Sequence, residues 1–537
     1  MFAGDLIAER ARVTPDKTAL VSIETGERLT YADLDARVDR AASALRASGL
    51  EPGDRFGLLA HNCIEFIAMF FAAGRANVIV VPLSTRATAH ELEGIAADCG
   101  MKRVFVGAEF ENTPLSVVRY PLSGLRSASL SPPDIGHRTS DNENAVYCLL
   151  YTSGTTGKPK GVMIPRRQLL WNGYNTVVNW SLREDDVSPI YTPLYHAGGL
   201  AAFLIPIFTV GGTIVLHKSF NVADVWRTIE HERCTVVLGV PTIWKMLMDA
   251  PEFATADLSH VRWFISGGAP LPQFIIDAYQ KRGVVFKQGY GMTEVGVNCF
   301  TMTAEESVRK PGSIGRPLLF TEVKLMMERR LPAGRSAGVP PASDDLAARK
   351  AADRPAGSRR SEELCEVEDG DNVDGIGEMY IRGPHVSLGY WNNEEATRDA
   401  YTDDGWFKTG DLARRDADGF FYIAGRRKEM FISGGVNVYP AEIEAELVSH
   451  PSVSDAAVVA VPDETWGEVG IAFVVAKNMT EESLAAYLAE RIARYKIPRR
   501  FVFLESLPRT PYGKVVKEDL RKQLQVQFTP REDAGSE

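Results

Sequence analysis

Residues 151–161, Tyr-Thr-Ser-Gly-Thr-Thr-Gly-Lys-Pro-Lys-Gly, combine three glycines, four Ser or Thr hydroxyls and two lysines. Glycines let the backbone approach a ligand closely, hydroxyl and amide groups donate hydrogen bonds, and lysines supply positive charge. This chemistry suits the phosphates of a nucleotide. The stretch is not a Walker A loop, because Pro159 stands where that pattern requires a glycine followed by Lys and Ser or Thr. Short glycine-rich stretches are most often ordinary surface loops, so the motifs downstream must support the interpretation.

A second group of candidate residues lies in the stretch 284–294, Val-Val-Phe-Lys-Gln-Gly-Tyr-Gly-Met-Thr-Glu. Its apolar beginning is typical of a strand, and its polar end brings an aromatic ring, a hydroxyl and a carboxylate to the carboxyl end of that strand. Tyr290 could stack on a nucleobase, Thr293 could bind a phosphate, and Glu294 could bind Mg²⁺, which prefers carboxylate and phosphate oxygens. Each of these residue types is more often structural when it occurs alone.

The surrounding sequence predicts an α/β fold that would position both motifs. Short apolar stretches typical of strands alternate with amphipathic stretches typical of helices. We expect strands at 55–60, 78–81, 102–106, 145–150, 162–164, 235–240 and 261–266, and helices at 64–73, 89–99 and 242–248. This alternation favours parallel sheets, and ligands of open α/β sheets bind at the carboxyl ends of the strands.

The composition is that of a globular protein with more than one domain. The chain has 537 residues, of which 45% are hydrophobic and 24% charged, so it exceeds one ordinary core. The net charge of −10 argues against a nucleic-acid binder, and an anionic substrate would have to be held by local positive groups. The six cysteines are scattered, with no CxxC pair and no His/Cys cluster at metal spacing, which indicates a reducing compartment and no structural zinc. Residues 1–10 do not resemble a signal peptide, so we expect a cytoplasmic protein.

The stretch 197–216 is uncharged over twenty residues and would be long enough to span a bilayer. Pro206 and the pairs Gly198-Gly199 and Gly211-Gly212 interrupt it, and the Thr-Ile-Val-Leu that follows the second pair is typical of a strand. We therefore expect a buried helix, a turn and a strand, and no transmembrane segment. Peripheral contact with a membrane stays open.

The α/β pattern stops at 328–374. Up to residue 360 this segment is rich in Ala, Pro, Gly, Ser and Arg, and residues 362–374 carry seven carboxylates and no base. The segment has few large apolar side chains, and their burial cannot offset the entropy lost on ordering. We therefore expect a disordered insertion. A tolerated surface insertion is the simpler interpretation, and a regulatory or partner-binding role stays open.

Short strands joined by Gly and Asp turns are expected after the insertion, at 377–383, 405–412 and 419–426, as an antiparallel or barrel-like subdomain. A charged junction follows at 427–429. Beyond it, helices expected at 441–448 and 481–493 and a strand expected at 456–461 predict a compact α+β unit.

Five blocks in this order resemble the ANL superfamily of adenylate-forming enzymes, which includes acyl-CoA synthetases, aryl-CoA ligases, firefly luciferases and nonribosomal-peptide adenylation domains. The blocks are 151–161, Gly-Tyr-Gly-Met-Thr-Glu at 289–294, Thr-Gly-Asp at 409–411, Gly-Arg-Arg-Lys-Glu at 425–429 and Pro-Arg-Thr-Pro-Tyr-Gly-Lys at 508–514. The likeness covers nearly the whole chain except the insertion. It implies a large N-terminal AMP-binding domain, 1–426, made of parallel-sheet α/β subdomains and a small β-barrel-like subdomain. A hinge at 427–428 and a mobile α+β C-terminal domain, 429–537, would follow.

The resemblance implies a two-step reaction. A carboxylate attacks the α-phosphorus of MgATP and gives acyl-AMP and pyrophosphate, and a thiol, usually coenzyme A, then takes the acyl group. The residues implied for the β- and γ-phosphates are Thr152, Ser153, Gly154, Thr155, Thr156, Gly157, Lys158 and Lys160. Those implied for the rest of the nucleotide are Gly268, Ala269, Pro270, Gly289, Tyr290, Gly291, Met292, Thr293, Asp411, Tyr422 and Arg426, with Asp411 accepting both ribose hydroxyls.

The implied catalytic residues are Thr293 at the α-phosphate, Glu294 as the Mg²⁺ ligand, His196 and Lys514. Lys514 would place a cation where negative charge builds in the transition state. Lys428 matches the hinge position, about which the small domain rotates after adenylation. That rotation would withdraw Lys514 and bring Ser433, Gly434 and Gly435 to the coenzyme A tunnel, so that each half-reaction has its own closed state.

The acid is only partly indicated. Amino-acid adenylation domains place an Asp after an aromatic residue to hold the amino group, whereas this chain has His196 at the comparable place. Malonate-type ligases tend to carry a basic residue where Gly289 stands. The run 430–440 is most similar to bacterial fatty-acid–CoA ligases, so a fatty or medium-chain acid is expected, in a tunnel near His196 and 289–292. An aryl or alicyclic acid fits the same motifs.

Two other classes stay open. A fatty-acyl-AMP ligase stops at the adenylate and carries an insertion in the region of 328–374, but an obstructing insertion must dock through apolar contacts, which this segment almost lacks. A catalytically inactive nucleotide sensor is disfavoured by the intact Lys514, Glu294 and Asp411. The expected partners are a carboxylic acid, ATP, Mg²⁺ and coenzyme A, with no nucleic acid, and the chain would be a monomer or a homodimer.

Overall fold

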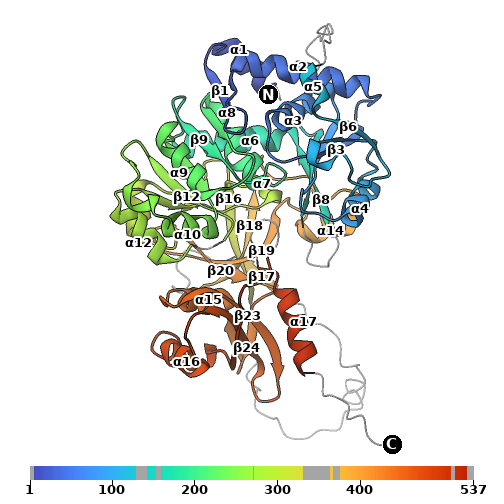
Figure 1. Ribbon diagram of the computed structural model, residues 1–537. Helices are drawn as coiled ribbons and strands as arrows, with labels where there is room; N and C mark the ends of the chain where they lie inside the picture. The colour runs from blue at the N-terminus through green and yellow to red at the C-terminus, as the bar shows by residue number, and fades with distance from the viewer. Residues whose placement is uncertain are drawn as a thin grey trace, which may run out of the picture.

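The computed structural model describes residues 5–127, 142–152, 159–269, 271–329, 363–366, 375–509 and 515–528. A large body contains the chain up to strand β20 (Phe421–Arg426), and a smaller one contains the chain from strand β21 (Phe431–Ser433) onward (Figure 1). We call the smaller one the C-terminal unit. The two bodies lie one above the other in Figure 1, and the chain passes between them at 427–430.

The first sheet of the large body has six strands in the order β6-β5-β3-β4-β7-β8. They are β3 (Arg55–Leu59), β4 (Ile79–Pro82), β5 (Arg103–Val106), β6 (Val118–Pro121), β7 (Val146–Thr152) and β8 (Lys160–Pro165). All neighbours are parallel except β7 and β8, which form an antiparallel pair at the edge. The helices between them include α3 (Ile64–Ala76), which is buried along its whole length, and α4 (Ala89–Cys99), which starts at a capping box of Thr88 and Glu91.

A second set of parallel strands forms two short sheets, β2-β1-β10-β9 and β11-β12-β13, in which only β2 is antiparallel to its neighbour. The strands are β1 (Thr18–Ser22), β2 (Arg28–Thr30), β9 (Val187–Ile190), β10 (Thr213–Leu216), β11 (Val236–Gly239), β12 (Trp263–Ser266) and β13 (Phe286–Gln288). Their helices are α1 (Leu6–Val13), α2 (Tyr31–Ala47), α6 (Arg166–Trp180), α9 (Val222–His231), α10 (Pro241–Asp249) and α12 (Gln273–Lys281). The strand-and-helix alternation predicted from the sequence is confirmed, and so is the α/β fold class.

The uncharged stretch 197–216 folds as expected. It forms a short helix α7 (Ala197–Gly199), a π-helical turn (Leu200–Leu204), helix α8 (Ile205–Val210) and strand β10. Its apolar side chains, among them Phe203 and Phe208, lie in the main core beneath α2 and α3. In the part of the chain that the structure describes, no helix is both long enough and apolar enough to cross a membrane.

The third part of the large body is an antiparallel sheet in the order β17-β16-β18-β19-β20. Its strands are β16 (Glu322–Arg329), β17 (Glu363–Glu366), β18 (Gly377–Arg382), β19 (Phe407–Arg415) and β20. An isolated bridge between Gly315 and Phe421 continues the hydrogen-bonded path beyond β20. Helix α14 (Glu394–Ala400) lies in the connection between β18 and β19. This sheet is the antiparallel subdomain expected after the insertion.

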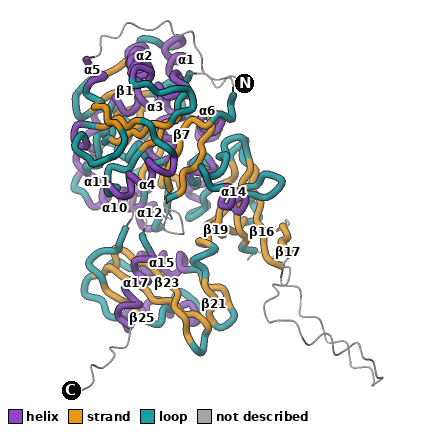
Figure 2. Tube along the Cα trace, turned by 90° about the vertical axis from the view of Figure 1, so that its right-hand side faces the viewer, coloured by secondary structure: helices purple, strands orange, loops and turns teal. Residues whose placement is uncertain are grey.

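Parts of the range 328–374, where we expected a disordered insertion, form strands. Strand β16 continues to Arg329, and Glu363–Glu366 form the edge strand β17 paired with Met326–Arg329 (Figure 2). The acidic composition did not prevent this, because ladder hydrogen bonds join backbone groups whatever the side chains are. Residues 330–362 and 367–374 of the predicted insertion lie outside the described residues.

The C-terminal unit contains a five-stranded sheet of β21, β22 (Val436–Val438), β23 (Val453–Asp463), β24 (Gly467–Ala476) and β25 (Arg500–Phe503). Helices α15 (Pro440–Val448) and α16 (Glu481–Ala489) pack on one face, and α17 (Lys517–Phe528) packs on the other. The helix expected at 481–493 ends at Ala489, because the chain turns there and Ile492 packs back against the cluster beneath α16. The predicted α+β unit is otherwise confirmed.

Candidate active site

The ends of the predicted phosphate loop meet at one point of the first sheet. Thr152 of β7 and Lys160 of β8 lie directly opposite each other in the antiparallel pair, and residues 153–158 lie outside the described residues. The hydroxyl of Tyr151 donates to Asp98 Oδ2 at 2.5 Å, and a Cβ atom at Gly161 would lie 3.0 Å from the Tyr151 ring. This close contact favours glycine at 161, and the Tyr151 hydrogen bond ties the base of the loop to helix α4.

A segment of the connection between β18 and β19 runs along the other side of β8. Met163 N donates to Gly389 O at 2.8 Å, Leu388 N donates to Met163 O at 3.0 Å, and Trp391 N donates to Gly161 O at 2.8 Å. We call residues 387–391 the strap. The strap places the ring of Tyr390 beside Lys160, whose Nζ lies 5.2 Å from the ring centroid.

The strap also contacts Glu294, the predicted Mg²⁺ ligand. Glu294 lies in a single 3-10 turn, Thr293–Val295, is 6% exposed, and accepts a hydrogen bond from Tyr390 Oη at 3.1 Å. The peptide oxygens of this turn are also held, since Ser387 N donates to Glu294 O and Gln168 Nε2 donates to Thr293 O. Lys160 and Glu294, from motifs far apart in the sequence, are therefore linked by one tyrosine.

The turn before Glu294 passes very close to the backbone of Val297. A Cβ atom at Gly291 would lie 1.7 Å from the Val297 carbonyl oxygen, so only glycine fits there. No group of three or more His, Cys, Asp or Glu side chains that could hold a metal was found among the described residues. Glu294 would offer a cation one carboxylate, and Mg²⁺ in nucleotide sites binds through one or two carboxylates together with phosphate oxygens and water.

Asp411, Tyr290 and Arg426 form the second polar cluster. Tyr290 Oη donates to Asp411 Oδ2 at 2.6 Å, and Arg426 Nε lies 3.4 Å from Asp411 Oδ1. Asp411 and Arg426 are direct partners across β19 and β20, and the Asp411 side chain is 11% exposed. Burial, and next the Asp411 carboxylate, hold the pKa of Tyr290 well above its usual value, so the phenol stays protonated and donates.

The structure does not bring Tyr422 into this cluster. Its hydroxyl donates to Asp416 Oδ2 at 3.3 Å, and the Arg414 guanidinium lies over its ring at 4.0 Å. A bulge between Leu412 and Ala413 shifts the pairing with β20. Phe421 and Ile423 of β20 belong to the apolar cluster against which Tyr290 and Met292 pack. Side chains of a regular strand point alternately to its two faces, but a count of this alternation from Arg426 cannot predict the shift that a bulge introduces.

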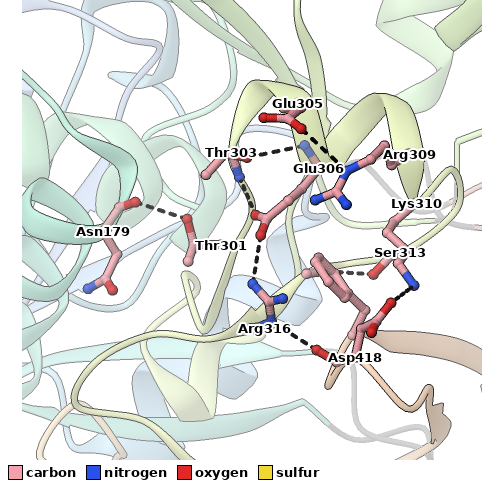
Figure 3. Close-up of polar contacts among 12 residues, drawn as sticks. Asn179, Thr301, Thr303, Glu305, Glu306, Arg309, Lys310, Ser313, Arg316 and Asp418 are labelled. Carbon is pink, nitrogen blue, oxygen red and sulfur yellow. Dashed lines mark hydrogen bonds and ion pairs between the residues drawn. The ribbon is translucent and has the colours of Figure 1, made fainter.

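The hairpin that carries Asp411 and Arg426 is braced at its turn. Helix α13 (Ala304–Arg309) starts at a capping box of Thr303 and Glu306, and Glu306 pairs with Arg316 at 2.6 Å. Arg316 Nε donates to Asp418 O, and Lys310 Nζ lies 2.6 Å from Asp418 Oδ2 (Figure 3). The turn between β19 and β20 is thus tied to the chain that follows Glu294.

The predicted adenine side lies at the carboxyl ends of β12 and β13. Gly289 N donates to Ser266 O at 2.8 Å and Gly267 N donates to Gly239 O at 3.1 Å, so these turns lie side by side. Gly268 has φ +84°, a left-handed conformation that favours glycine. Ala269 follows it, and Pro270 lies outside the described residues.

His196 stands at the start of α7, with its ring 4.8 Å from that of Tyr195. A Cβ atom at Gly199 would lie 2.4 Å from Pro193 O, so the turn that carries His196 needs this glycine. Asn298, shortly after Glu294, donates to Ala202 O at 2.9 Å in the π-helical turn. This hydrogen bond connects the segment that follows Glu294 to the segment that follows His196.

The predicted hinge is a turn with an ion pair on each side of Lys428. Arg427 Nη1 lies 2.9 Å from Glu378 of β18, and Arg427 N donates to Gly410 O. Glu429 lies 2.7 Å from Lys517 Nζ of α17, and Lys517 also lies 2.7 Å from Glu444 of α15. Residue 427 is therefore tied to the large body and residue 429 to the C-terminal unit.

The predicted coenzyme A residues form the turn of the β21–β22 hairpin. Gly434 and Gly435 have φ +57° and +82°, as a two-residue turn of type I′ requires. Ser433 is buried, and a Cβ atom at Gly434 would lie 2.7 Å from the Trp466 ring. Lys514 lies outside the described residues, three positions before Lys517.

Sequence reasoning missed the residues that link the motifs, chiefly Tyr390, Glu378, Lys517 and Glu444. The one local signal for Tyr390 is the Gly-Tyr pair at 389–390, the same dipeptide as at 289–290. The signal for Lys517 is its three-residue spacing from Lys514.

Comparisons with known proteins agree with this geometry. Residues 7–338 match the family of AMP-binding enzymes, and residues 442–514 match the AMP-binding enzyme C-terminal domain. The feruloyl-CoA synthase of an Amycolatopsis species is 37% identical over 527 residues, covering 97% of this chain and 98% of the relative. The long-chain-fatty-acid–CoA ligase FadD13 of Mycobacterium tuberculosis is 34% identical, with 97% and 98% covered.

Solved structures match over almost the whole chain. The o-succinylbenzoate CoA synthetase MenE of Bacillus subtilis, in complex with its acyl-adenylate intermediate, has a TM-score of 0.80 and 30% identity over 96% of this chain and 98% of its own. ATP-bound MatB of Rhodopseudomonas palustris has a TM-score of 0.83 and 29% identity, with 98% and 100% covered. The chain belongs to the AMP-binding enzyme family of the ANL superfamily and is an AMP-forming acid–CoA ligase.

Proposed function

We propose that this ligase activates a carboxylic acid with MgATP and transfers it to coenzyme A through an acyl-AMP intermediate. The observation that carries the proposal is the convergence of two polar clusters, Lys160–Tyr390–Glu294 and Asp411–Tyr290–Arg426, from motifs far apart in the sequence. One cluster offers a cation and a carboxylate, and the other offers acceptor oxygens. This combination suits a metal-bound triphosphate at one end and a ribose at the other.

In the first half-reaction, Thr152 to Lys160 hold the β- and γ-phosphates. Lys160 supplies positive charge at the end of this loop. Thr293 binds the α-phosphate oxygen, and Glu294 holds Mg²⁺, which neutralises charge that develops on the phosphates. Asp411 accepts the ribose hydroxyls, with Arg426 beside it and the ring of Tyr290 against the base. Lys514 stabilises the attacking carboxylate and the α-phosphate.

In the second half-reaction, the C-terminal domain, 429–537, rotates about a hinge at 427–428 relative to the N-terminal domain, 1–426. The rotation withdraws Lys514 and presents the hairpin turn at Ser433, Gly434 and Gly435 to the thiol. The ion pairs at Arg427 and Glu429 support this assignment, because they leave Lys428 as the residue between two anchored neighbours. A backbone rotation concentrated at one residue is the usual form of a hinge.

The acid is proposed to be a fatty or medium-chain acid bound near His196 and 289–292. An aryl acid is the second candidate, favoured by the 37% identity to a feruloyl-CoA synthase. A fatty-acyl-AMP ligase is the weaker alternative, since the relatives that match 97% of the chain are named as CoA synthases and CoA ligases. A cytoplasmic location and a monomeric or homodimeric state complete the proposal.

The test is a panel of acids (acetate through palmitate, benzoate, coumarate, ferulate and malonate) with MgATP, with and without coenzyme A. Pyrophosphate and acyl products are both measured. A thioester that forms only with coenzyme A supports the ligase and identifies the acid. Acyl-AMP that accumulates despite coenzyme A would overturn the second half-reaction and favour the AMP ligase. If the protein binds ATP but releases pyrophosphate with none of the acids, the catalytic proposal is contradicted.

A further inference from the structure

Tyr390 lies at a junction of three parts of the large body. Its backbone belongs to the strap in the β18–β19 connection, its ring lies beside Lys160 of the first sheet, and its hydroxyl reaches Glu294 of the turn after β13. Tyr390 N donates to Thr397 Oγ1 at 2.9 Å, and an isolated bridge pairs Tyr390 with Val162. The position of the ring is therefore fixed by backbone contacts on both sides.

The hydroxyl of Tyr390 restricts the Glu294 carboxylate. A hydrogen bond at 3.1 Å to Oε1 opposes rotation of the carboxylate about its last bond. Burial, and next the charge of Glu294, raise the pKa of Tyr390, so the phenol keeps the proton that it donates. The carboxylate is thus held in one orientation before any cation arrives, which removes part of the entropy cost of binding.

The ring of Tyr390 also acts on Lys160. The ammonium group lies 5.2 Å from the ring centroid, within the range of a cation–π contact. Because Lys160 ends the predicted phosphate loop, the same side chain limits the movement of the cation that meets the phosphates and of the carboxylate that meets the metal.

We propose that Tyr390 is a positioning residue that fixes the metal carboxylate Glu294 relative to the phosphate lysine Lys160, so that both bind one Mg²⁺–triphosphate group. The inference rests on the proposed function, because it assumes MgATP as the ligand. Tyr390 itself need not touch substrate. Its two contacts are separable, since phenylalanine removes the hydroxyl and keeps the ring, whereas leucine removes both.

The experiment measures pyrophosphate release as a function of free Mg²⁺ for the parent enzyme, Tyr390→Phe and Tyr390→Leu. We expect Tyr390→Phe to raise the Mg²⁺ concentration for half-maximal rate about 5- to 20-fold, with kcat recovering at high Mg²⁺. Tyr390→Leu is expected to raise the KM for ATP about 3- to 10-fold in addition. Thioester formation from supplied acyl-AMP and coenzyme A, which needs no metal-bound triphosphate, should stay within twofold of the parent and shows that the variants are folded.

The matched control is Tyr401→Phe. Tyr401 is also a tyrosine whose hydroxyl bonds within the strap, with contacts to Ser387 Oγ at 2.9 Å and Ser387 O at 3.0 Å. Its Mg²⁺ midpoint should match that of the parent. A Tyr390→Phe midpoint within twofold of the parent, or an equal shift in Tyr401→Phe, overturns the inference. A parent enzyme that releases no pyrophosphate overturns the proposed function instead, so the two failures are distinguishable.

Discussion

Replacing Lys517 by methionine would leave two carboxylates of the C-terminal unit without their shared cation. Lys517 Nζ lies 2.7 Å from both Glu429 and Glu444, and the three side chains are only 13%, 26% and 21% exposed. Removing one partner of a fully buried ion pair costs about 3–5 kcal/mol. Because water still reaches about a fifth of each carboxylate, we expect a loss below this range, about 2–3 kcal/mol of the stability of the C-terminal unit.

The loss should depend on pH in a defined direction. Burial raises the pKa of Glu444 despite Lys517, and without Lys517 that pKa rises further. A carboxyl whose folded pKa exceeds its unfolded value destabilises the fold as pH rises through the unfolded value. Burial raises the pKa of Glu429, but Lys517, Arg426 and Lys428 together lower it by more, so the net pKa is lowered. The stabilisation from Glu429 is therefore present at neutral pH and lost on acidification. The Glu444 effect makes the difference between parent and variant largest at pH 7–8 and smaller as pH falls toward about 5, whereas the Glu429 effect persists until the pH falls below about 4.

The assay is native-state hydrogen exchange of α17 and of strands β21 to β24, since a chain of several domains does not unfold in two states. A loss of about 2–3 kcal/mol corresponds to roughly 30- to 160-fold faster exchange in these elements at pH 7.5. Lys522→Met is the control on the same helix, because Lys522 is 65% exposed and its pair with Asp519 is long, at 3.7 Å. Exchange less than threefold faster in Lys517→Met, or equally faster in Lys522→Met, would refute the reasoning.

Three further predictions concern the reaction. Lys514→Ala should lower ATP–pyrophosphate exchange by about two to three orders of magnitude, because a charge stabiliser of the transition state is lost; full exchange would remove this assignment. Lys428→Pro should spare adenylation and block thioester formation, since proline fixes φ at the hinge; equal rates in both half-reactions would show that rotation does not occur there. Gly291→Ala should abolish ATP binding in calorimetry, because its Cβ would lie 1.7 Å from Val297 O, whereas Gly94→Ala in helix α4, where a Cβ meets no atom within 4 Å, should bind as the parent does.

The elements that were predicted correctly are those that depend on residues close together in the sequence. Strands β3, β5 and β12 and helices α3 and α4 follow from short apolar stretches and helix caps, so they were predicted within a few residues. The ends of the antiparallel sheet were not, because the pairing of β17 with β16 joins segments separated by a long stretch of polar sequence. Composition describes what a segment can bury, and says little about an edge strand stabilised by its neighbour.

The candidate site likewise has some features that the sequence predicts and others that depend on the tertiary structure. The sequence by itself determined the motif residues and the chemistry they can perform, because residue types at fixed spacing carry that information locally. Only the tertiary structure decided that the Tyr422 hydroxyl bonds to Asp416, that Tyr390 joins Lys160 to Glu294, and that Lys517 ties α17 to the hinge. The physical reason is that a bulge shifts the register of a strand by one residue. Contacts across 88 or 96 positions likewise depend on how whole sheets and helices pack, and no local periodicity encodes that packing.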